Sequence, residues 1–197
     1  MDKVKLGAVP WVYPVPIVLA GATVDGRPNF CTLGDCGIMG IRPPLVYVSL
    51  NEAHLTTRGI VDTGVYSVNV PSADMMAVTD YCGMVSGREV DKSALFEVFY
   101  GELGTAPMIR ACPINLECTV VHDFSIQHRH VFVGEVSQAY VDREYAVERE
   151  GRWQVAHMAN LNPIVYALDN CYYRVGESIG QGYREGKRFE ATTRLED

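Results

Sequence analysis

Turn signals divide this chain into short runs of apolar and β-branched residues, and that division restricts the fold more than any other feature of the sequence. Residues 17–23 form one such run, and the turn residues Asp25-Gly26-Arg27-Pro28 follow it. A second extended stretch begins at Asn29, so the pattern predicts a β-hairpin. Glu150-Gly151-Arg152 signals another hairpin. The same pattern predicts further strands at 45–50, 65–70, 114–121, 131–136 and 170–175.

In two segments the apolar residues recur at loosely helical spacing. Residues 52–62 form the first, which Thr63-Gly64 is expected to end. Ser72 is expected to cap the second, which runs through Tyr81 and stops at Gly83. Because short strands outnumber these helices, the sequence predicts a mainly β fold and a small barrel rather than a parallel α/β sheet. No internal repeat or linker divides the chain, so a single domain over residues 1–197 is expected.

Alternating side chains at 114–121 predict a half-buried strand. Apolar residues occupy the even-numbered positions from Ile114 to Val120, and mainly polar residues such as Asn115 and Glu117 occupy the positions between them. Since successive side chains of a strand point to opposite faces, the even-numbered residues should face the core. Asn115 and Glu117 should then face solvent.

The charge and the cysteine content restrict the partners and the location of the protein. Its 197 residues include 24 acidic and 17 basic side chains, which gives a net charge of −7. Such a chain repels nucleic acid and anionic membranes, so neither is an expected partner. Its six cysteines include no C-x-x-C pair and are expected to be buried free thiols, which fits a reducing cytoplasm.

The amino-terminal region contains an uncharged stretch of a length that can indicate a signal peptide or a membrane helix. Nineteen residues from Leu6 to Val24 carry no charge, and they follow Lys3 and Lys5. Three prolines interrupt the stretch, and each disfavours helix by removing a backbone donor and restricting the residue before it. An extended arm leading into a strand is therefore expected, without export or membrane insertion. The three prolines are Pro10, Pro14 and Pro16.

Motifs of several common enzyme classes are missing or lack their structural context. Gly180-Gln181-Gly182 with Gly186 resembles a dinucleotide fingerprint, but no apolar strand-to-helix context surrounds it. The chain has no G-x-x-x-x-G-K-[ST] loop. A G-x-S-x-G string occurs at 176–180, but it lies in the glycine-rich, charged tail and not at a strand-to-helix turn, so an esterase is not indicated. His128 and His130, with His122, have no acidic partner at a convincing spacing, so no metal site is expected.

The segment from Tyr81 to Ser93 has the composition of an anion-binding turn. It reads Y-C-G-M-V-S-G-R-E-V-D-K-S, and its two glycines allow left-handed backbone conformations. Ser86 offers a hydroxyl group, while Arg88 and Lys92 bring positive charge into an acidic chain. A solvated loop after a helix fits the same composition, so both interpretations stay open at this point.

A second candidate phosphate site lies where the strand ending in Ser49-Leu50-Asn51 leads into a helix. The first turn of that helix carries His54, Thr56 and Thr57. Backbone N–H groups and the positive end of the helix dipole favour a phosphate there. Ordinary helix capping also explains Ser, Thr and Asn at these positions, so the residues alone fit either explanation.

Several segments occur together in the order found in one protein family. The residues S-G-R-E-V-D-K at 86–92 resemble the S-G-R/K-x-x-D-K signature of the flavoredoxin branch of the flavin reductase-like family. The stretch N-P-I-V-Y-A-L-D-N-C-Y-Y-R-V-G resembles that family's carboxyl-terminal signature. The other matching segments are the proline-rich N-terminal strand, 29–32, 46–50 with His54 and Thr56, 66–70 and 132–136. The resemblance covers almost the whole chain, and it implies a Greek-key, FMN-binding split β-barrel with a few short helices.

The resemblance also implies where FMN would lie. Asn29 and the backbone of Cys31 and Thr32 would line the isoalloxazine ring and the ribityl chain. Ser49 and Leu50 would continue that wall. The residues that would hold the phosphate, at the helix start and in the glycine turn, are His54, Thr56, Thr57 and Lys92.

Members of this family are usually dimers that share their sites, so the resemblance implies a homodimer. His130 and the segment Asn162-Pro163-Ile164 would lie near the flavin, reaching it from the partner subunit. This chain departs from its relatives, which often have aromatic residues at the positions of Asp35 or Cys36 and of Leu161 or Asn162. Loss of those rings would open the flavin face to a different substrate.

The resemblance implies an oxidoreductase whose chemistry belongs to the cofactor. A protein that binds FMN must neutralise a phosphate, cover one apolar ring face and direct donors to the pyrimidine edge. No side-chain nucleophile or acid–base pair is required. An enzyme of this kind would take electrons from NAD(P)H and pass them to free flavin or a protein acceptor. The alternatives are a flavoredoxin-type carrier that holds FMN permanently and exchanges electrons with redox proteins, and a flavin-binding protein with neither activity.

Overall fold

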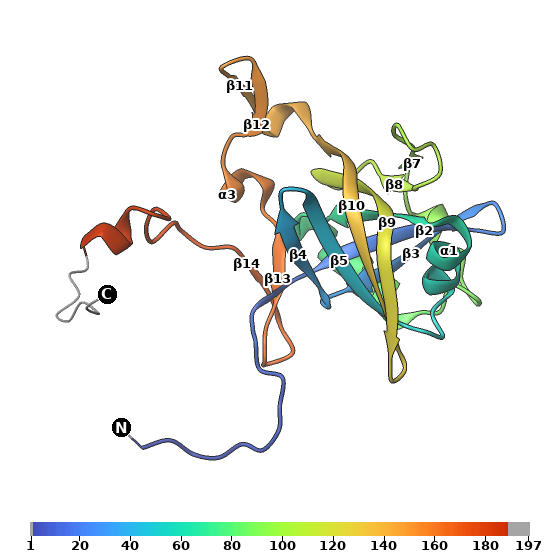
Figure 1. The fold of residues 1–197 in the computed structure, drawn as a ribbon, viewed down its shortest axis with the longest axis horizontal. Coiled ribbons are helices and arrows are strands. Elements are labelled where there is room, and N and C mark those ends of the chain that lie inside the picture. The colour runs from blue at the N-terminus through green and yellow to red at the C-terminus, as the bar shows by residue number, and fades with distance from the viewer. Residues whose placement is uncertain (1, 189–197) are drawn as a thin grey trace, which may run out of the picture.

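Seven antiparallel strands form the central sheet of the computed structural model, which describes residues 2–188 (Figure 1). Their order across the sheet is β3-β2-β6-β9-β10-β5-β4. The strands are β2 (Val18–Val24), β3 (Arg27–Leu33), β4 (Cys36–Ile41), β5 (Pro44–Asn51), β6 (Val65–Val70), β9 (Ile114–Ile126) and β10 (Arg129–Val141).

Smaller elements surround this sheet. One three-stranded sheet contains β1 (Val15–Pro16), β13 (Ile164–Tyr166) and β14 (Tyr172–Arg174). Two hairpins are β7 (Val98–Phe99) with β8 (Met108–Ile109), and β11 (Ala146–Arg149) with β12 (Arg152–Val155). The helices are α1 (Leu55–Thr63), α2 (Met76–Met84) and α3 (Met158–Leu161), with 3₁₀ turns at Ala73–Met75, Lys92–Leu95, Arg143–Tyr145 and Glu185–Arg188.

The two edges of the central sheet lie next to each other, which makes it a split barrel. β3 and β4 occupy opposite edges, yet only Gly34 and Asp35 separate them in the chain. The sheet must therefore curl until its edges meet. Ser49 donates its backbone N–H to the Asp35 carbonyl oxygen at 2.8 Å, but no ladder of hydrogen bonds joins β3 to β4 or β5 among residues 2–188. The mainly β, split-barrel prediction is confirmed.

The interior of the barrel is filled by side chains from every strand of the central sheet. Tyr66 and Phe132 are the largest rings in this core, and Val48, Leu50 and Ile60 pack with them. The Tyr66 hydroxyl group donates a hydrogen bond of 2.7 Å to the Val46 carbonyl oxygen, so the one polar atom of this buried ring is satisfied.

Both faces of β9 are covered in its first half, and the expectation that Asn115 and Glu117 face solvent is wrong. Their exposed fractions are 4% and 0%. The cause is the segment from β7 to β8, whose backbone packs on the second face of the sheet. The Glu117 carboxylate accepts hydrogen bonds from the backbone N–H groups of Glu102 and Leu103 at 2.8 and 3.0 Å, and from the Tyr140 hydroxyl group at 2.6 Å.

The structure confirms the β2–β3 and β11–β12 hairpins, and β6 begins and ends at the predicted residues. Helix α1 ends at Thr63 with Gly64 as a left-handed C-cap, as predicted. Helix α2 is different, because it continues through Gly83 to Met84, and the Ser72 side chain makes no capping hydrogen bond. Glycine fits here because a Cβ atom on residue 83 would lie 3.3 Å from Thr32 Cβ, so α2 can pack closely on β3.

The proline-rich arm extends away from the barrel (Figure 1). Residues 2–14 contain no helix or strand, in agreement with the predicted extended arm. Among the residues that the structure describes, no helix has the length and apolar character needed to cross a membrane.

Candidate functional site

A cavity of about 220 Å³ lies between β3, the start of α1 and the segment that follows α2. We call it the Lys92 cavity. Five of the predicted cofactor-binding residues line it, although they come from three separate parts of the chain. They are Asn29, Cys31, His54, Thr56 and Lys92.

The α1 side of the Lys92 cavity presents a helix start without a side-chain cap. His54 occupies the N-cap position, but its side chain makes no capping hydrogen bond, and the first turn contains no acidic residue. The first N–H groups of any α-helix lack intrahelical acceptors and carry a partial positive charge. Asn29 Nδ2 donates a hydrogen bond of 2.7 Å to Thr56 Oγ1, which fixes β3 to this first turn.

Lys92 adds a buried positive charge to the lining of the cavity. Its exposed fraction is 4%, and its Nζ donates a hydrogen bond of 2.7 Å to the Cys82 carbonyl oxygen. Within residues 2–188 no carboxylate lies within ion-pair distance of this ammonium group. Buried charges are normally paired, since desolvation without a counter-charge is costly. The cavity therefore has the electrostatics of an anion site.

His54 adds a neutral imidazole to this site. Burial lowers its pKa, and the nearby charges of Lys92 and Arg129 lower it further. Its Nδ1 lies 3.5 Å from Cys31 Sγ. Burial raises the pKa of the Cys31 thiol, so this pair is neutral at pH 7. The positive potential thus comes from Lys92, Arg129 and the helix start.

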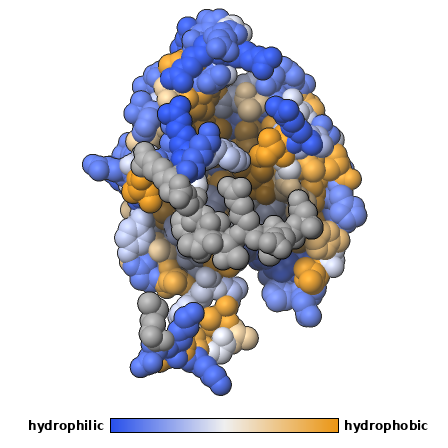
Figure 2. All heavy atoms as spheres, turned by 60° about the vertical axis from the view of Figure 1, so that its left-hand side comes forward, coloured by the Kyte–Doolittle hydropathy of each residue, from blue (hydrophilic) through white to orange (hydrophobic). Residues whose placement is uncertain are grey.

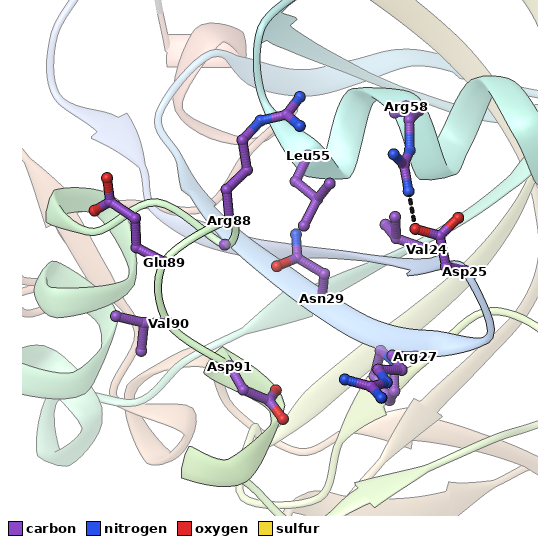
Figure 3. Close-up of a pocket in the computed structure, with 12 residues that line it drawn as sticks. Val24, Asp25, Arg27, Asn29, Leu55, Arg58, Arg88, Glu89, Val90 and Asp91 are labelled. Atoms are coloured by element: carbon purple, nitrogen blue, oxygen red, sulfur yellow. Dashed lines mark hydrogen bonds and ion pairs between the residues drawn. The ribbon is translucent and has the colours of Figure 1, made fainter.

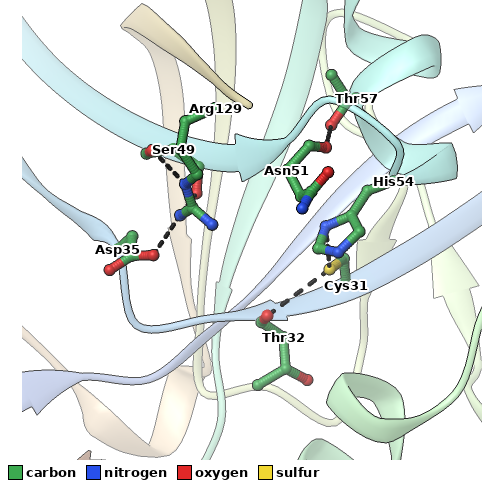
Figure 4. A network of polar contacts seen from close by, with 8 residues as sticks. All are labelled: Cys31, Thr32, Asp35, Ser49, Asn51, His54, Thr57 and Arg129. Carbon is green, nitrogen blue, oxygen red and sulfur yellow. Dashed lines mark hydrogen bonds and ion pairs between the residues drawn. The ribbon is translucent and has the colours of Figure 1, made fainter. Parts of the chain in front are cut away.

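Arg129 was not among the predicted site residues, and it organises the wall beside the cavity (Figure 4). Its Nε donates to Ser49 Oγ at 3.2 Å, and its NH2 group donates to the Ser49 carbonyl oxygen at 2.6 Å. The same NH2 group forms an ion pair with Asp35. β10 pairs with β5 so that Arg129 lies opposite Asn51. This pairing joins residues about eighty positions apart in the chain, so sequence periodicity carries no sign of it.

The structure does not bring the other five predicted residues into the Lys92 cavity. Thr57 donates its hydroxyl group to the Asn51 carbonyl oxygen at 2.7 Å, and Thr32 donates its hydroxyl group to the Thr79 carbonyl oxygen. Leu50 lies in the barrel core. Ser49 accepts from Arg129, as described above. His130 pairs with the Asp123 carboxylate at 2.7 Å and stacks on the Phe132 ring, with centroids 4.2 Å apart.

In the described part of the chain, no group of three or more His, Cys, Asp or Glu side chains is arranged to hold a metal ion.

The segment after α3 was expected to lie near the flavin. Asn162 adopts a left-handed conformation, and its carbonyl oxygen accepts a hydrogen bond of 2.8 Å from the Ala73 N–H. Within one chain this segment therefore packs on the start of the 3₁₀ turn at Ala73–Met75 and does not line the Lys92 cavity.

A second cavity of about 590 Å³ borders the first, and we call it the arginine cavity (Figure 3). The two share Asn29, Leu55 and Gly87. Arg58 lies there in an ion pair with Asp25. Figure 3 shows the Arg88 side chain directed toward the start of α1 and that of Glu89 directed away from it. The remaining arginine in this cavity is Arg27.

Gly87 is required by the close approach of the glycine turn to β3. A Cβ atom at this position would lie 2.2 Å from Asn29 Oδ1. Gly87→Ala should push the Asn29 amide away from Thr56 and lower the free energy of unfolding by about 1 to 3 kcal/mol. Urea unfolding measures this change. Gly176→Ala is the matched control, because a Cβ atom there meets nothing within 4 Å. Equal stabilities for the two variants would show that the turn adapts and that the contact is unimportant.

Known proteins resemble this chain in both sequence and structure. A family model described as a flavin reductase like domain matches residues 12–168. Flavoredoxin from Methanosarcina acetivorans is 41% identical, with a TM-score of 0.88 over 95% of this chain and 98% of that one. Flavoredoxin of Desulfovibrio vulgaris (Miyazaki F) is 31% identical, with a TM-score of 0.83 over 94% of this chain and 100% of that one.

More distant matches support the same fold. An FMN-binding protein from Thermus thermophilus has a TM-score of 0.74 at 22% identity, over 92% of this chain and 99% of that one. An uncharacterized protein of Archaeoglobus fulgidus is 27% identical over 128 residues, which are 64% of this chain and 72% of that protein. The family model covers most of the chain, and two flavoredoxins exceed 30% identity over nearly their full length. This chain therefore belongs to the flavin reductase-like family.

Proposed function

We propose that this protein binds FMN and uses it to transfer electrons, taking them from NAD(P)H and passing them to free flavin or a protein acceptor. The observation that carries the proposal is the buried Lys92 ammonium group, which has no carboxylate partner among residues 2–188 and lines the same small cavity as the start of α1. A phosphate supplies the missing counter-charge. The flavoredoxins at 41% and 31% identity support a flavin as the molecule that carries it.

The residues around the Lys92 cavity fit the phosphate and ribityl parts of FMN. Lys92 and the uncapped start of α1 would hold the phosphate, with Thr56 as a further hydroxyl contact. Asn29 and Cys31 follow along β3 and would contact the ribityl chain. Gly83 and Met84 also line a larger neighbouring cavity, which leaves room for the ring.

The positive charge of Arg129 would stabilise the reduced form of a bound flavin. FMN, when bound, supplies the hydride and single-electron chemistry that side chains lack. The guanidinium group is held by Ser49 and Asp35, so its orientation is fixed before any ligand binds. A fixed positive charge of this kind stabilises negative charge that develops on reduction. His54, being neutral, offers a hydrogen bond without adding charge.

Anaerobic mixing with NADH or NADPH tests the choice between an enzyme and a carrier. A cavity of about 780 Å³ adjoins the Lys92 cavity, and it is large enough for a second ring to approach the flavin. We therefore expect one of the two nucleotides to bleach the flavin absorption within seconds. If neither nucleotide bleaches it over many minutes while dithionite does so at once, the protein is a flavoredoxin-type carrier, as the names of its two flavoredoxin relatives suggest.

We also propose a homodimer. Exposed large hydrophobic side chains occur on the N-terminal arm, β4, β12 and α3, which lie toward one side of the molecule in Figure 1. Figure 2 turns that side forward and shows hydrophobic patches among hydrophilic residues. An interface between two copies would bury these side chains. The exposed hydrophobic side chains that we expect in this interface are Trp11, Val12, Ile38, Met39, Trp153 and Met158. Light scattering should then give twice the mass of one chain.

A further inference from the structure

Asp35 lies at the seam where the two edges of the central sheet meet. Its backbone carbonyl oxygen accepts the hydrogen bond of 2.8 Å from the Ser49 N–H of β5, and its carboxylate forms the ion pair with Arg129 of β10 (Figure 4). The same residue contributes to the lining of the cavity of about 780 Å³, which leaves room for the flavin ring. An acidic residue therefore borders the proposed position of the ring.

The positive charge of Arg129 acts on residues of the Lys92 cavity. Burial has the largest influence on the pKa values of His54 and Cys31, lowering the first and raising the second. Lys92 has the second largest influence and Arg129 the third, and both lower the pKa of each residue. His54 and Cys31 line the Lys92 cavity. The field of Arg129 therefore extends from β10 to β3 and to the start of α1, where FMN would bind.

Arg129 has two partners, and only one of them carries a charge. Ser49 accepts hydrogen bonds from the guanidinium group through its hydroxyl and carbonyl oxygens, at 3.2 and 2.6 Å. Asp35 supplies a negative charge, and within residues 2–188 no second carboxylate lies within ion-pair distance of Arg129. Because Ser49 holds the guanidinium group as well, Asp35→Asn removes the charge and retains both the contacts with Ser49 and an oxygen acceptor at position 35.

We infer that Asp35 sets the reduction potential of the bound flavin by offsetting the charge of Arg129. Transfer of a hydride, which is two electrons and one proton, gives the flavin one additional negative charge. A positive charge nearby favours this change, and a negative charge opposes it. Asp35 therefore keeps the potential lower than Arg129 alone would, which makes the reduced flavin a stronger donor. This role rests on the proposed function, and it deepens it by naming a residue that adjusts the driving force of electron transfer to the acceptor.

Asp35→Asn should raise the midpoint potential of bound FMN, because the charge of Arg129 then acts without its counter-charge. The potential is measured anaerobically against a reference dye in low-salt buffer. We expect the equilibrium constant for two-electron reduction to increase about three- to tenfold, which corresponds to a rise of about 15 to 30 mV. Arg129→Met should shift the potential in the opposite direction. High salt should reduce the effect of Asp35→Asn, since the Asp35 side chain is 68% exposed.

Glu97→Gln is the matched control for this variant. Glu97 is also an exposed acid in an ion pair with an arginine, Arg110, at 2.6 Å. Neither of these two residues lines any of the three cavities described above. Each variant thus loses the charge of one exposed ion pair, but only Asp35→Asn loses it beside the proposed flavin site. Glu97→Gln should keep the potential of the unaltered protein.

The pKa of His54 provides a second measurement, which needs no FMN. It is followed by NMR in the protein without cofactor. Arg129→Met should raise this pKa, because a positive charge that lowers it is removed. Asp35→Asn should lower it, because the charge of Arg129 is then no longer offset. A raised pKa of His54 in Asp35→Asn would show that Asp35 holds Arg129 in place instead of offsetting its charge, and it would overturn the inference.

The midpoint potential and the binding of FMN separate the remaining outcomes. A potential for Asp35→Asn that is equal to that of Glu97→Gln, or lower, would overturn the inference. FMN binding is followed independently by the absorption spectrum. If FMN binds and Asp35→Asn leaves its potential unchanged, only the role of Asp35 is wrong. If FMN does not bind to the unaltered protein, the proposed function is wrong, and the role of Asp35 fails with it.

Discussion

Lys92→Met should weaken FMN binding about ten- to a hundredfold, because a charge-assisted hydrogen bond to a phosphate contributes roughly 1.5 to 3 kcal/mol. Lys92 is 4% exposed and has no carboxylate partner among residues 2–188, so its charge is available to a ligand. Methionine keeps the length and burial of the side chain while removing the charge. Calorimetric or fluorescence titration with FMN measures the change.

Two controls separate this effect from a general loss of structure. Riboflavin lacks the phosphate, so its affinity should be nearly the same for Lys92→Met and for the unaltered protein. Lys5→Met removes a lysine from the exposed N-terminal arm and should leave FMN binding unchanged. The melting temperature of Lys92→Met should not fall, since burying an ammonium group without a counter-charge is itself unfavourable. Equal losses for FMN and riboflavin would place Lys92 away from the phosphate.

Glu117→Ala should have the largest effect on stability, a loss of about 3 kcal/mol or more in the free energy of unfolding. Its carboxylate is fully buried and accepts three hydrogen bonds, from Glu102 N–H, Leu103 N–H and the Tyr140 hydroxyl group. Removing it leaves buried donors without acceptors, and each such donor costs about 1 to 3 kcal/mol. For a chain of this length that corresponds to a fall of roughly 6 to 12 °C in the melting temperature.

The matched control for this variant is Glu52→Ala, which removes an exposed carboxylate and should change the melting temperature little. Tyr140→Phe removes one of the three donors together with its hydroxyl group and should cost less than Glu117→Ala. A melting temperature for Glu117→Ala equal to that of Glu52→Ala would show that the segment from β7 to β8 does not depend on this carboxylate.

Local sequence patterns predicted most of the strands, because those strands are bounded by turn residues whose preferences are local. The β2–β3 hairpin, β6 and the end of α1 at Gly64 are examples. The patterns failed at residues that a segment distant in the sequence covers or packs against. Glu117 alternates with apolar residues as a solvent-facing residue would, but the segment from β7 to β8 covers it. Gly83 resembled a helix stop, but it allows α2 to pack on β3.

The candidate site was only partly predictable for the same reason. The composition of the glycine turn indicated an anion site, and the structure brings Lys92 of that turn to the cavity beside His54 and Thr56. Arg129 was not predicted because its contacts with Ser49 and Asp35 depend on the pairing of β10 with β5. The neighbouring cavity of about 780 Å³ was not predicted for a similar reason, since it lies beside β1 and β13, which come from opposite ends of the chain.

Binding of FMN is tested most directly by titrating the purified protein with FMN and recording absorption spectra and calorimetric heats. We expect the protein to be yellow as purified or to take up one FMN per chain, with a shift in the flavin spectrum as the ring leaves water. Absence of both heat and spectral shift at high micromolar FMN would contradict it, because the buried Lys92 charge and the uncapped start of α1 would then have to serve another anion.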